Sequence, residues 1–420
     1  MTGCKLGRPR GTRHHLGRWL TIIFAGTSLL TSYQAFGQDD PGMPKSAAEA
    51  STIEQQDALP LTSLYEAPET LKNTKAGDLL RKEAFDGYTL PPGASATRIL
   101  YHSTDGHGAD VATSAVVLVP AGTPPAGGWP IIAWAHGTSG MARACAPSLM
   151  KDVYYGQDLA NLLKGGFAIV ATDYHGLGTK GPHRYMDKAA QADDVIYSVP
   201  AAQAAVSTLG KDWVVDGHSQ GGLAAWGVAE RQVELKDPTY RGAIAVAGAV
   251  HLPRLLDHPE EAKGAGFYFS WHAYAVQTRY KDFKASDMLS KIGMQHYEDA
   301  TSNGCWLYGY ASYLGVDDVA MLKPGWSKNK WVSKFYREET AGFKPIQGPI
   351  LVLAGEDDHS VPIAGIKEVV ERACKNKQSV TFKSYPGLDH DPTMSASVPD
   401  QLDWIRDRLS GKSPSPNCAN

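Results

Sequence analysis

The sequence predicts an α/β fold in which a mostly parallel sheet is flanked by helices. The first observation is a series of short, continuously apolar runs, which is the pattern of strands buried on both faces. The second is that helix-like segments alternate with these runs, as crossovers between parallel strands require. The third is a pair of apolar segments ahead of the series, separated by a Gly-containing turn. This pair predicts an antiparallel hairpin at the edge of the sheet.

The elements follow in order along the chain. The hairpin is predicted over residues 98–102 and 112–120. The strands after it are predicted at residues 129–135, 167–172, 213–215, 243–247, 349–354 and 380–385. The helices between them are predicted at residues 152–165, 193–209, 222–235 and 363–374. Residues 76–250 and 346–420 therefore form one predicted catalytic domain, which is interrupted by an insertion.

The insertion, residues 251–345, holds 17 of the 39 aromatic residues of the chain in under a quarter of its length. Such a segment between two neighbouring strands can form a second small core. It can also be a cap that gives an apolar wall to a substrate pocket. We expect it to do both.

The N-terminus has the order of a secretory signal. Five basic residues and no acidic residue are followed by an apolar run at 19–30, which is too short to span a bilayer. Ala35 and Gly37 are small residues at the spacing that a signal peptidase reads. We expect residues 1–37 to be removed near Gly37 and Gln38, giving a secreted or periplasmic protein. Residues 38–75, rich in Ala, Asp, Pro, Ser and Thr, are predicted to be a flexible leader.

The charge of the mature chain excludes one class of partner. Without the signal, 36 basic residues face 44 acidic ones, which gives a net charge of about −8. Nucleic-acid binding through bulk charge is therefore excluded. No stable protein partner is predicted.

Four cysteines remain in the mature chain, and an even count in an exported protein predicts disulfides. Three pairings are open. The hypothesis is that Cys374–Cys418 holds the C-terminal tail and that Cys145–Cys305 ties a loop to the insertion.

Ser219 is the candidate nucleophile. It is the centre of a G-x-S-x-G motif, GHSQG at residues 217–221, between a predicted strand and a predicted helix. The glycines allow a tight turn that projects the hydroxyl above the sheet, beside the N–H groups of a helix N-terminus. The alternative is an ordinary polar residue in a Gly-rich turn.

An acid and a base follow in the order that this arrangement requires. Acidic residues come directly after the strand at 349–354, and Asp358 is preferred over Asp357 and Glu356 because it lies three residues before Val361-Pro362. His390 is predicted in a loop after the strand at 380–385, where an imidazole could reach Ser219.

The predicted site is completed by the acids beside His390 and by two donors for an oxyanion. Asp389 and Asp391, which flank His390, are treated as surface residues. An oxyanion needs two backbone donors, and we expect these to be the N–H groups of Gln220 and Thr138, with Gly137 allowing close approach.

Cofactors and metals are not predicted. The G-x-G-x-x-G run at 176–181 is followed at once by Pro182 and opens no apolar helix, which disfavours a dinucleotide site. The histidines and cysteines lack the spacings of zinc sites.

The chain resembles the α/β-hydrolase superfamily and, within it, the secretory lipase family. Segments 136–148, 173–185, 217–222 and 355–362 carry the resemblance, which extends from about residue 76 to the end. It implies secreted enzymes that cleave carboxylic esters, including lipid esters, without a cofactor. It also implies Ser219 as nucleophile, Asp358 as acid, His390 as base and a helical cap at 251–345.

The predicted function is a secreted serine esterase or lipase that acts through an acyl-enzyme on a small-molecule or lipid ester. Transient contact with a lipid interface would accompany a lipid substrate. A serine peptidase or amidase of the same fold is the alternative, and it would need a subsite for a charged amine terminus. A binding module that has lost its chemistry is the non-enzymatic alternative.

Overall fold

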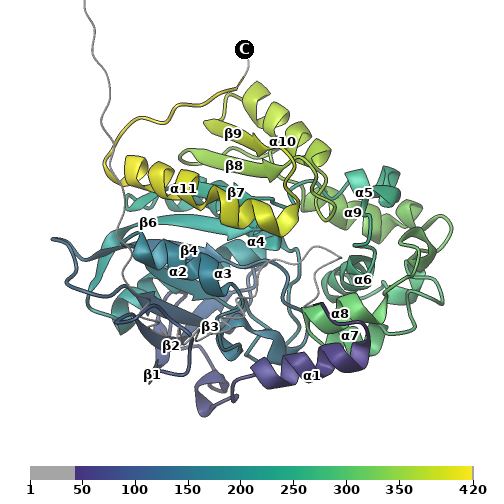
Figure 1. Ribbon diagram of the computed structural model, residues 1–420, viewed down its shortest axis with the longest axis horizontal. Helices are drawn as coiled ribbons and strands as arrows, with labels where there is room; N and C mark the ends of the chain where they lie inside the picture. The colour runs from purple at the N-terminus through teal and green to yellow at the C-terminus, as the bar shows by residue number, and fades with distance from the viewer. Residues whose placement is uncertain (1–42, 419–420) are drawn as a thin grey trace, which may run out of the picture. The chain divides into compact units, whose positions relative to one another are not determined.

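A computed structural model describes residues 43–418, so the predicted signal at 1–37 lies outside the described residues. Within them, nine strands form one sheet in the order β1-β2-β3-β5-β4-β6-β7-β8-β9 (Figure 1). The strands are β1 (Leu79–Phe85), β2 (Ser95–Thr104), β3 (Asp110–Val119), β4 (Trp129–Ala135), β5 (Ala168–Thr172), β6 (Leu209–His218), β7 (Tyr240–Val246), β8 (Ile350–Gly355) and β9 (Val380–Tyr385).

The pairing confirms the predicted α/β fold. From β5 to β9 all neighbours are parallel, whereas β1, β2, β3 and β5 pair antiparallel. The predicted hairpin is β2–β3, but it is not the edge of the sheet, because β1 pairs with β2 outside it. The sequence of β1, LLRKEAF, has charged residues in its centre, so it lacks the apolar run that identified the other strands.

Helices cover both faces of the sheet. Leucines of α2 (Gly156–Lys164) and apolar residues of α11 (His390–Leu409) share a core with Ile132 and Trp134 of β4. The alternate residues Ile131 and Ala133 point to the other face. That face packs against α3 (Lys188–Ala205), α4 (Gln220–Leu235) and α10 (Ile363–Lys375).

The insertion between β7 and β8 is helical and rich in buried aromatic residues, as predicted. Its helices are α5 (Arg254–Asp257), α6 (Tyr268–Arg279), α7 (Tyr297–Ser302), α8 (Trp306–Ser312) and α9 (Lys330–Glu338), with 3-10 turns η4 (Pro259–Glu261), η5 (Ala285–Asp287), η6 (Val319–Met321) and η7 (Trp326–Lys328). Phe269, Trp271, Phe335 and Tyr336 are fully buried in it. No helix of residues 43–418 has the length and hydropathy needed to cross a membrane.

The expectation of a flexible leader is wrong for the described part of residues 38–75. This part contains α1 (Ala47–Asp57) and the turn η1 (Ser63–Tyr65). Helix α1 lies along α8 of the insertion (Figure 1). The Glu54 carboxylate accepts hydrogen bonds from the backbone N–H groups of Cys305 at 3.0 Å and Tyr308 at 2.8 Å. The polar sequence of α1 gave no sign of order because tertiary contacts hold the helix in place.

Both predicted disulfides are present. Cys145, in the turn η2 (Arg143–Cys145) after β4, is bonded to Cys305, and Cys374 is bonded to Cys418. A further turn, η3 (Pro147–Leu149), follows η2. The first disulfide fixes the insertion to the loop that follows β4.

Candidate active site

Ser219 occupies a strained turn between β6 and α4. Its φ of 59° is in the left-handed region, which is unusual for a residue with a Cβ. A Cβ on Gly221 would lie 1.8 Å from the carbonyl oxygen of Ala135, and one on Gly217 would lie 2.1 Å from that of Gly221. Both glycines are therefore required for the turn, as the motif predicted.

His390 and Asp358 lie together, as the sequence predicted. Nδ1 of His390 is 2.8 Å from Oδ2 of Asp358, and both residues are buried. The other carboxylate oxygen of Asp358 accepts the N–H groups of Ser360 at 2.9 Å and Val361 at 2.7 Å. These bonds fix the orientation of the carboxylate, so the proton of the imidazole is held on Nδ1. The competing acids Glu356 and Asp357 are exposed.

His390 was predicted to lie in a loop. It is instead the first residue of α11. Asp389 is the N-cap, and its carboxylate accepts the N–H of His390 at 2.7 Å. Asp389 is partly exposed, with 38% of its side chain accessible. The Asp391 side chain is 34% exposed, but it lines the cavity that contains Ser219, and its Oδ1 is 3.8 Å from Nε2 of His218. The expectation of a surface residue missed this place in the site, because the start of α11 directs the side chain into the cavity.

The pKa of His390 is set by opposing effects. Burial lowers it, but the charge and hydrogen bond of Asp358 and the charges of Asp391 and Asp389 raise it, and the result is a pKa of about 9. Its Nε2 atom has no hydrogen-bond partner among the described residues. His390 and Ser219 line the same cavity.

The residues of the predicted oxyanion donors lie close to Ser219. Gln220 follows it as the first residue of α4, and the loop of Thr138 passes close by, since a Cβ on Gly137 would lie 3.2 Å from that of Ser219. The backbone N–H groups of Thr138 and Gln220 donate to no other described residue. The Thr138 hydroxyl lies 3.0 Å from that of Tyr185, which helps to hold the loop.

Tyr155 and His218 line the same cavity as Ser219. The Tyr155 hydroxyl accepts the N–H of Gly137 at 2.9 Å and lies 2.8 Å from Nδ1 of His218, to which it can donate. Burial and the charge of His390 lower the pKa of His218 well below its usual value, so this ring is neutral. No motif marks Tyr155, which lies in a segment that the sequence predicted to be helical.

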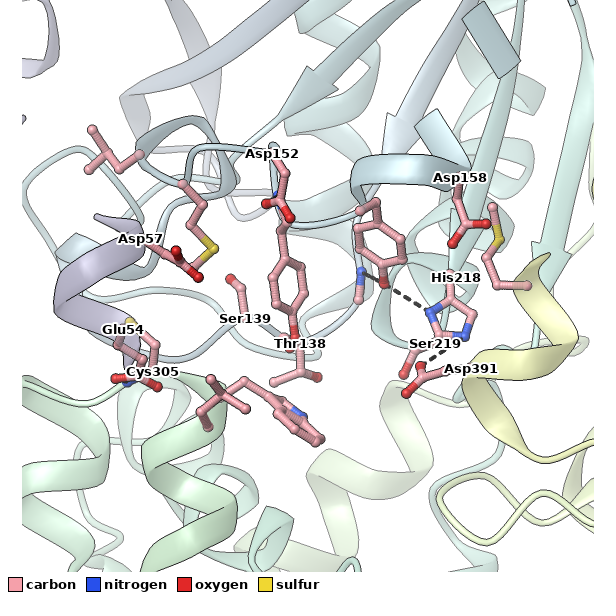
Figure 2. A pocket seen from close by; sticks show the side chains of 18 of the residues that line it. Glu54, Asp57, Thr138, Ser139, Asp152, Asp158, His218, Ser219, Cys305 and Asp391 are labelled. Atoms are coloured by element: carbon pink, nitrogen blue, oxygen red, sulfur yellow. Dashed lines mark hydrogen bonds and ion pairs between the residues drawn. The ribbon is translucent and has the colours of Figure 1, made fainter. Parts of the chain in front are cut away.

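Two cavities meet at Ser219. The first, of about 160 Å³, is lined by His390. His218 and several carboxyl groups also line it (Figure 2). The second, of about 70 Å³, has a wall that includes apolar residues of the insertion and of α10, such as Leu252, Phe269 and Ile366. The insertion therefore contributes the apolar wall that its aromatic content predicted.

One set of side chains has the composition of a metal site. Possible ligand atoms of His218, His390 and Asp391 lie within 4.8 Å of one another. A metal ion there would occupy Nε2 of His390, the one ring nitrogen left to act on Ser219. We therefore interpret these residues as a proton-transfer and charge network.

Comparison with known proteins identifies relatives of the chain. The model of the secretory lipase family matches residues 154–417, which is more than half of the chain. Lipase 9 of Candida albicans is 25% identical over 389 residues, covering 84% of this chain and 83% of that protein. Lipase 4 of the same organism is 26% identical over 277 residues, covering 62% and 59%.

Solved structures of lipases and esterases share the fold. Candida antarctica lipase A superposes with a TM-score of 0.71 at 17% identity, covering 86% of this chain and 89% of that one. The rice cell wall degrading esterase LipA from Xanthomonas oryzae superposes with a TM-score of 0.66 at 18% identity, covering 81% and 100%. With its mostly parallel sheet and helical insertion, the chain has the α/β-hydrolase fold, belongs to the secretory lipase family and is a carboxylic ester hydrolase.

Proposed function

We propose that Ser219, Asp358 and His390 form the catalytic triad of a serine esterase or lipase that works through an acyl-enzyme. One observation carries the proposal. The His390 ring is held by Asp358 through Nδ1, its Nε2 has no hydrogen-bond partner among the described residues, and His390 lines the cavity that contains the strained Ser219. A nucleophile, a base and an orienting acid are the parts that acyl transfer needs.

The steps follow from these positions. Neutral His390 takes the hydroxyl proton of Ser219 at Nε2 as the oxygen attacks the ester carbonyl. The resulting imidazolium, stabilised by Asp358, then gives the proton to the leaving alcohol, and the acyl group remains on Ser219. Water, deprotonated by the same nitrogen, releases the acid and restores the serine.

The negative charge of the tetrahedral intermediate would be bound by the backbone N–H groups of Gln220 and Thr138. Their lack of other partners supports this role. Loss of one such donor typically lowers kcat by about 10²–10³.

The substrate class is inferred from the relatives and from the apolar cavity. The curated relatives are named lipases, and Leu252, Phe269 and Ile366 offer an apolar surface for an acyl chain. We infer a lipid or small-molecule carboxylic ester as substrate, with transient contact at a lipid interface. We also infer export with cleavage near Gly37 and Gln38. The mass of the exported protein would test the cleavage site.

The test uses p-nitrophenyl butyrate and p-nitrophenyl palmitate. Ser219→Ala is expected to abolish turnover of both, whereas Ser286→Ala, an exposed serine of the insertion, should retain full activity. Mass spectrometry of a quenched reaction should find the acyl group on the peptide that contains Ser219. Turnover by Ser219→Ala would refute the mechanism, and faster cleavage of amino-acid anilides than of esters would favour the peptidase alternative.

A further inference from the structure

The two cavities at Ser219 have different roles in the proposed reaction. His390 has to protonate the departing alcohol, so the alcohol must leave on the side of His390. His390 lines the first cavity and does not line the second. We therefore name the first cavity, with Asp158, His218, Ser219, His390 and Asp391 in its wall, the leaving-group cavity. The second, apolar cavity is left for the acyl chain.

The leaving-group cavity is lined by carboxyl groups. They are Glu54, Asp57, Asp152, Asp158 and Asp391. No Lys or Arg is among its described lining residues. Glu54 is bound by backbone N–H groups, and Asp57 is paired with Lys151. The charge available to a ligand therefore lies on the remaining three acids.

Asp158 and Asp391 lie on either side of His218, close to the nucleophile (Figure 2). Asp158 accepts one hydrogen bond, from the hydroxyl of Ser395 at 2.8 Å. Asp391 faces the neutral His218 at 3.8 Å. Burial and the charge of Asp391 raise the pKa of Asp158 to about 6, although the Ser395 bond lowers it. Two carboxyl groups thus share a partly buried space, and a cationic ligand would relieve their repulsion.

Two further features of the cavity suit an organic cation. Its wall includes the rings of Tyr154, Tyr155, Tyr268 and Trp306, and aromatic faces attract ammonium groups. The Ser139 hydroxyl also lines the cavity (Figure 2). Ser139 is 1% exposed, and its hydroxyl has no hydrogen-bond partner among the described residues. A polar group of a ligand can satisfy it.

We propose that the leaving-group cavity recognises a cationic alcohol, so that the preferred substrates are esters whose alcohol carries an ammonium group. The proposal rests on the proposed function, because it assigns the alcohol side from the role of His390. The carboxyl groups disfavour an anionic alcohol for the same reason that they favour a cation.

The test compares esters that share one acyl group and differ in the charge of the alcohol. Butyrylcholine carries a quaternary ammonium, and 3,3-dimethylbutyl butyrate has the same shape with a carbon in place of the nitrogen. Wild-type enzyme should have a kcat/KM about ten-fold higher for the cationic ester. The preference should decrease as salt is added, because salt screens the attraction. Monobutyrin, whose alcohol is a neutral polyol, should also be slower than butyrylcholine.

Substitutions locate the preference in the cavity. Asp158→Asn should bring the ratio of the two kcat/KM values close to one, and Asp152→Asn should lower it less. Asp403→Asn, which removes a charge from an exposed position on α11, should leave the ratio within about two-fold of wild type.

The outcomes separate this proposal from the proposed function. If p-nitrophenyl butyrate is cleaved in a Ser219-dependent way but the neutral isostere or monobutyrin is cleaved as fast as butyrylcholine, the cationic preference is overturned and the esterase stands. A preference that survives Asp158→Asn and Asp152→Asn also overturns the assignment to this cavity. If no ester is cleaved at all, both proposals fail.

Discussion

The phenolic oxygen of Tyr155 joins two parts of the site, because it lies 2.8 Å from Nδ1 of His218 and 2.9 Å from the backbone nitrogen of Gly137. The loop that would supply the Thr138 donor is thereby held to the residue that precedes Ser219. Tyr155 is thus a positioning residue for the proposed oxyanion site.

Tyr155→Phe should lower kcat about ten-fold with little change in KM, because the loop loses its tie while the cavity walls keep their shape. The Gly137 N–H would also lose its partner, at a cost of about 1–3 kcal/mol in unfolding free energy. Kinetics with p-nitrophenyl butyrate and urea unfolding measure the two effects. Tyr385→Phe, which removes a hydroxyl bonded to Asp400 away from the cavities, is the control. An unchanged kcat for Tyr155→Phe would contradict the positioning role.

The pKa of His390 predicts an alkaline pH profile. With a pKa of about 9, the ring is protonated at neutral pH and becomes a base only as the pH rises. The value of kcat/KM should therefore increase with pH through about 9. The groups that face the ring are Asp358, Asp389, Asp391 and His218.

Asp391→Asn removes one charge that raises the pKa of His390, so it should move the rising limb of the profile to lower pH. Asp403→Asn should leave the limb in place, since Asp403 is exposed. The comparison needs correction for spontaneous ester hydrolysis. If the rising limb of kcat/KM lies near pH 7 and does not move in Asp391→Asn, these carboxylates do not control the pKa of His390.

Asp216, near the C-terminal end of β6, should make the stability of the fold depend on pH. Burial raises its pKa to about 8, and the N–H of Gly217 only partly offsets this. A raised pKa means that the folded state favours the protonated acid. This residue therefore makes folding less favourable as the pH rises from about 4 to about 8.

Asp216→Asn should remove that dependence. Between pH 5 and pH 8 the wild type should lose up to about 4 kcal/mol more unfolding free energy than the variant. Urea unfolding at the two pH values measures the difference. Asp212→Asn, a partly exposed position on the same strand, should behave like the wild type. If the unfolding free energy of all three proteins changes equally between pH 5 and pH 8, the prediction is wrong.

We expect the Cys145–Cys305 disulfide to affect both the free energy of unfolding and substrate binding in the leaving-group cavity. It closes a loop with a sequence separation of 160, and Cys305 lines the leaving-group cavity. Replacing both cysteines by alanine should cost about 2–5 kcal/mol and raise KM, because α8 loses its covalent tie. The Cys374–Cys418 pair, with a separation of 44, is the matched control, and its removal should leave KM unchanged. If both double variants change KM equally, the Cys145–Cys305 disulfide has no special role in holding α8 at the leaving-group cavity.

Local patterns in the sequence were sufficient for most of the fold. The buried strands are continuous apolar runs, and the GHSQG motif fixes the turn because its glycines face carbonyl oxygens at distances that no side chain allows. The order of Ser219, Asp358 and His390 along the chain predicted that the three residues lie near one another, since parallel strands bring their carboxyl ends to one edge of the sheet. Strand β1 and helix α1 escaped detection because polar residues interrupt their apolar patterns.

By itself, the sequence determined the fold class and predicted the three residues of the proposed triad, because both depend on residue types at short spacings or on chain order. It left three disulfide pairings open, and the tertiary structure decided between them because the paired cysteines are far apart in the chain. The tertiary structure alone decided that Tyr155 supports the loop of Gly137, that Asp391 faces the site, and that Asp158 shares its cavity. These residues come from separate elements and carry no motif. Their roles depend on distances across the fold, and packing sets those distances.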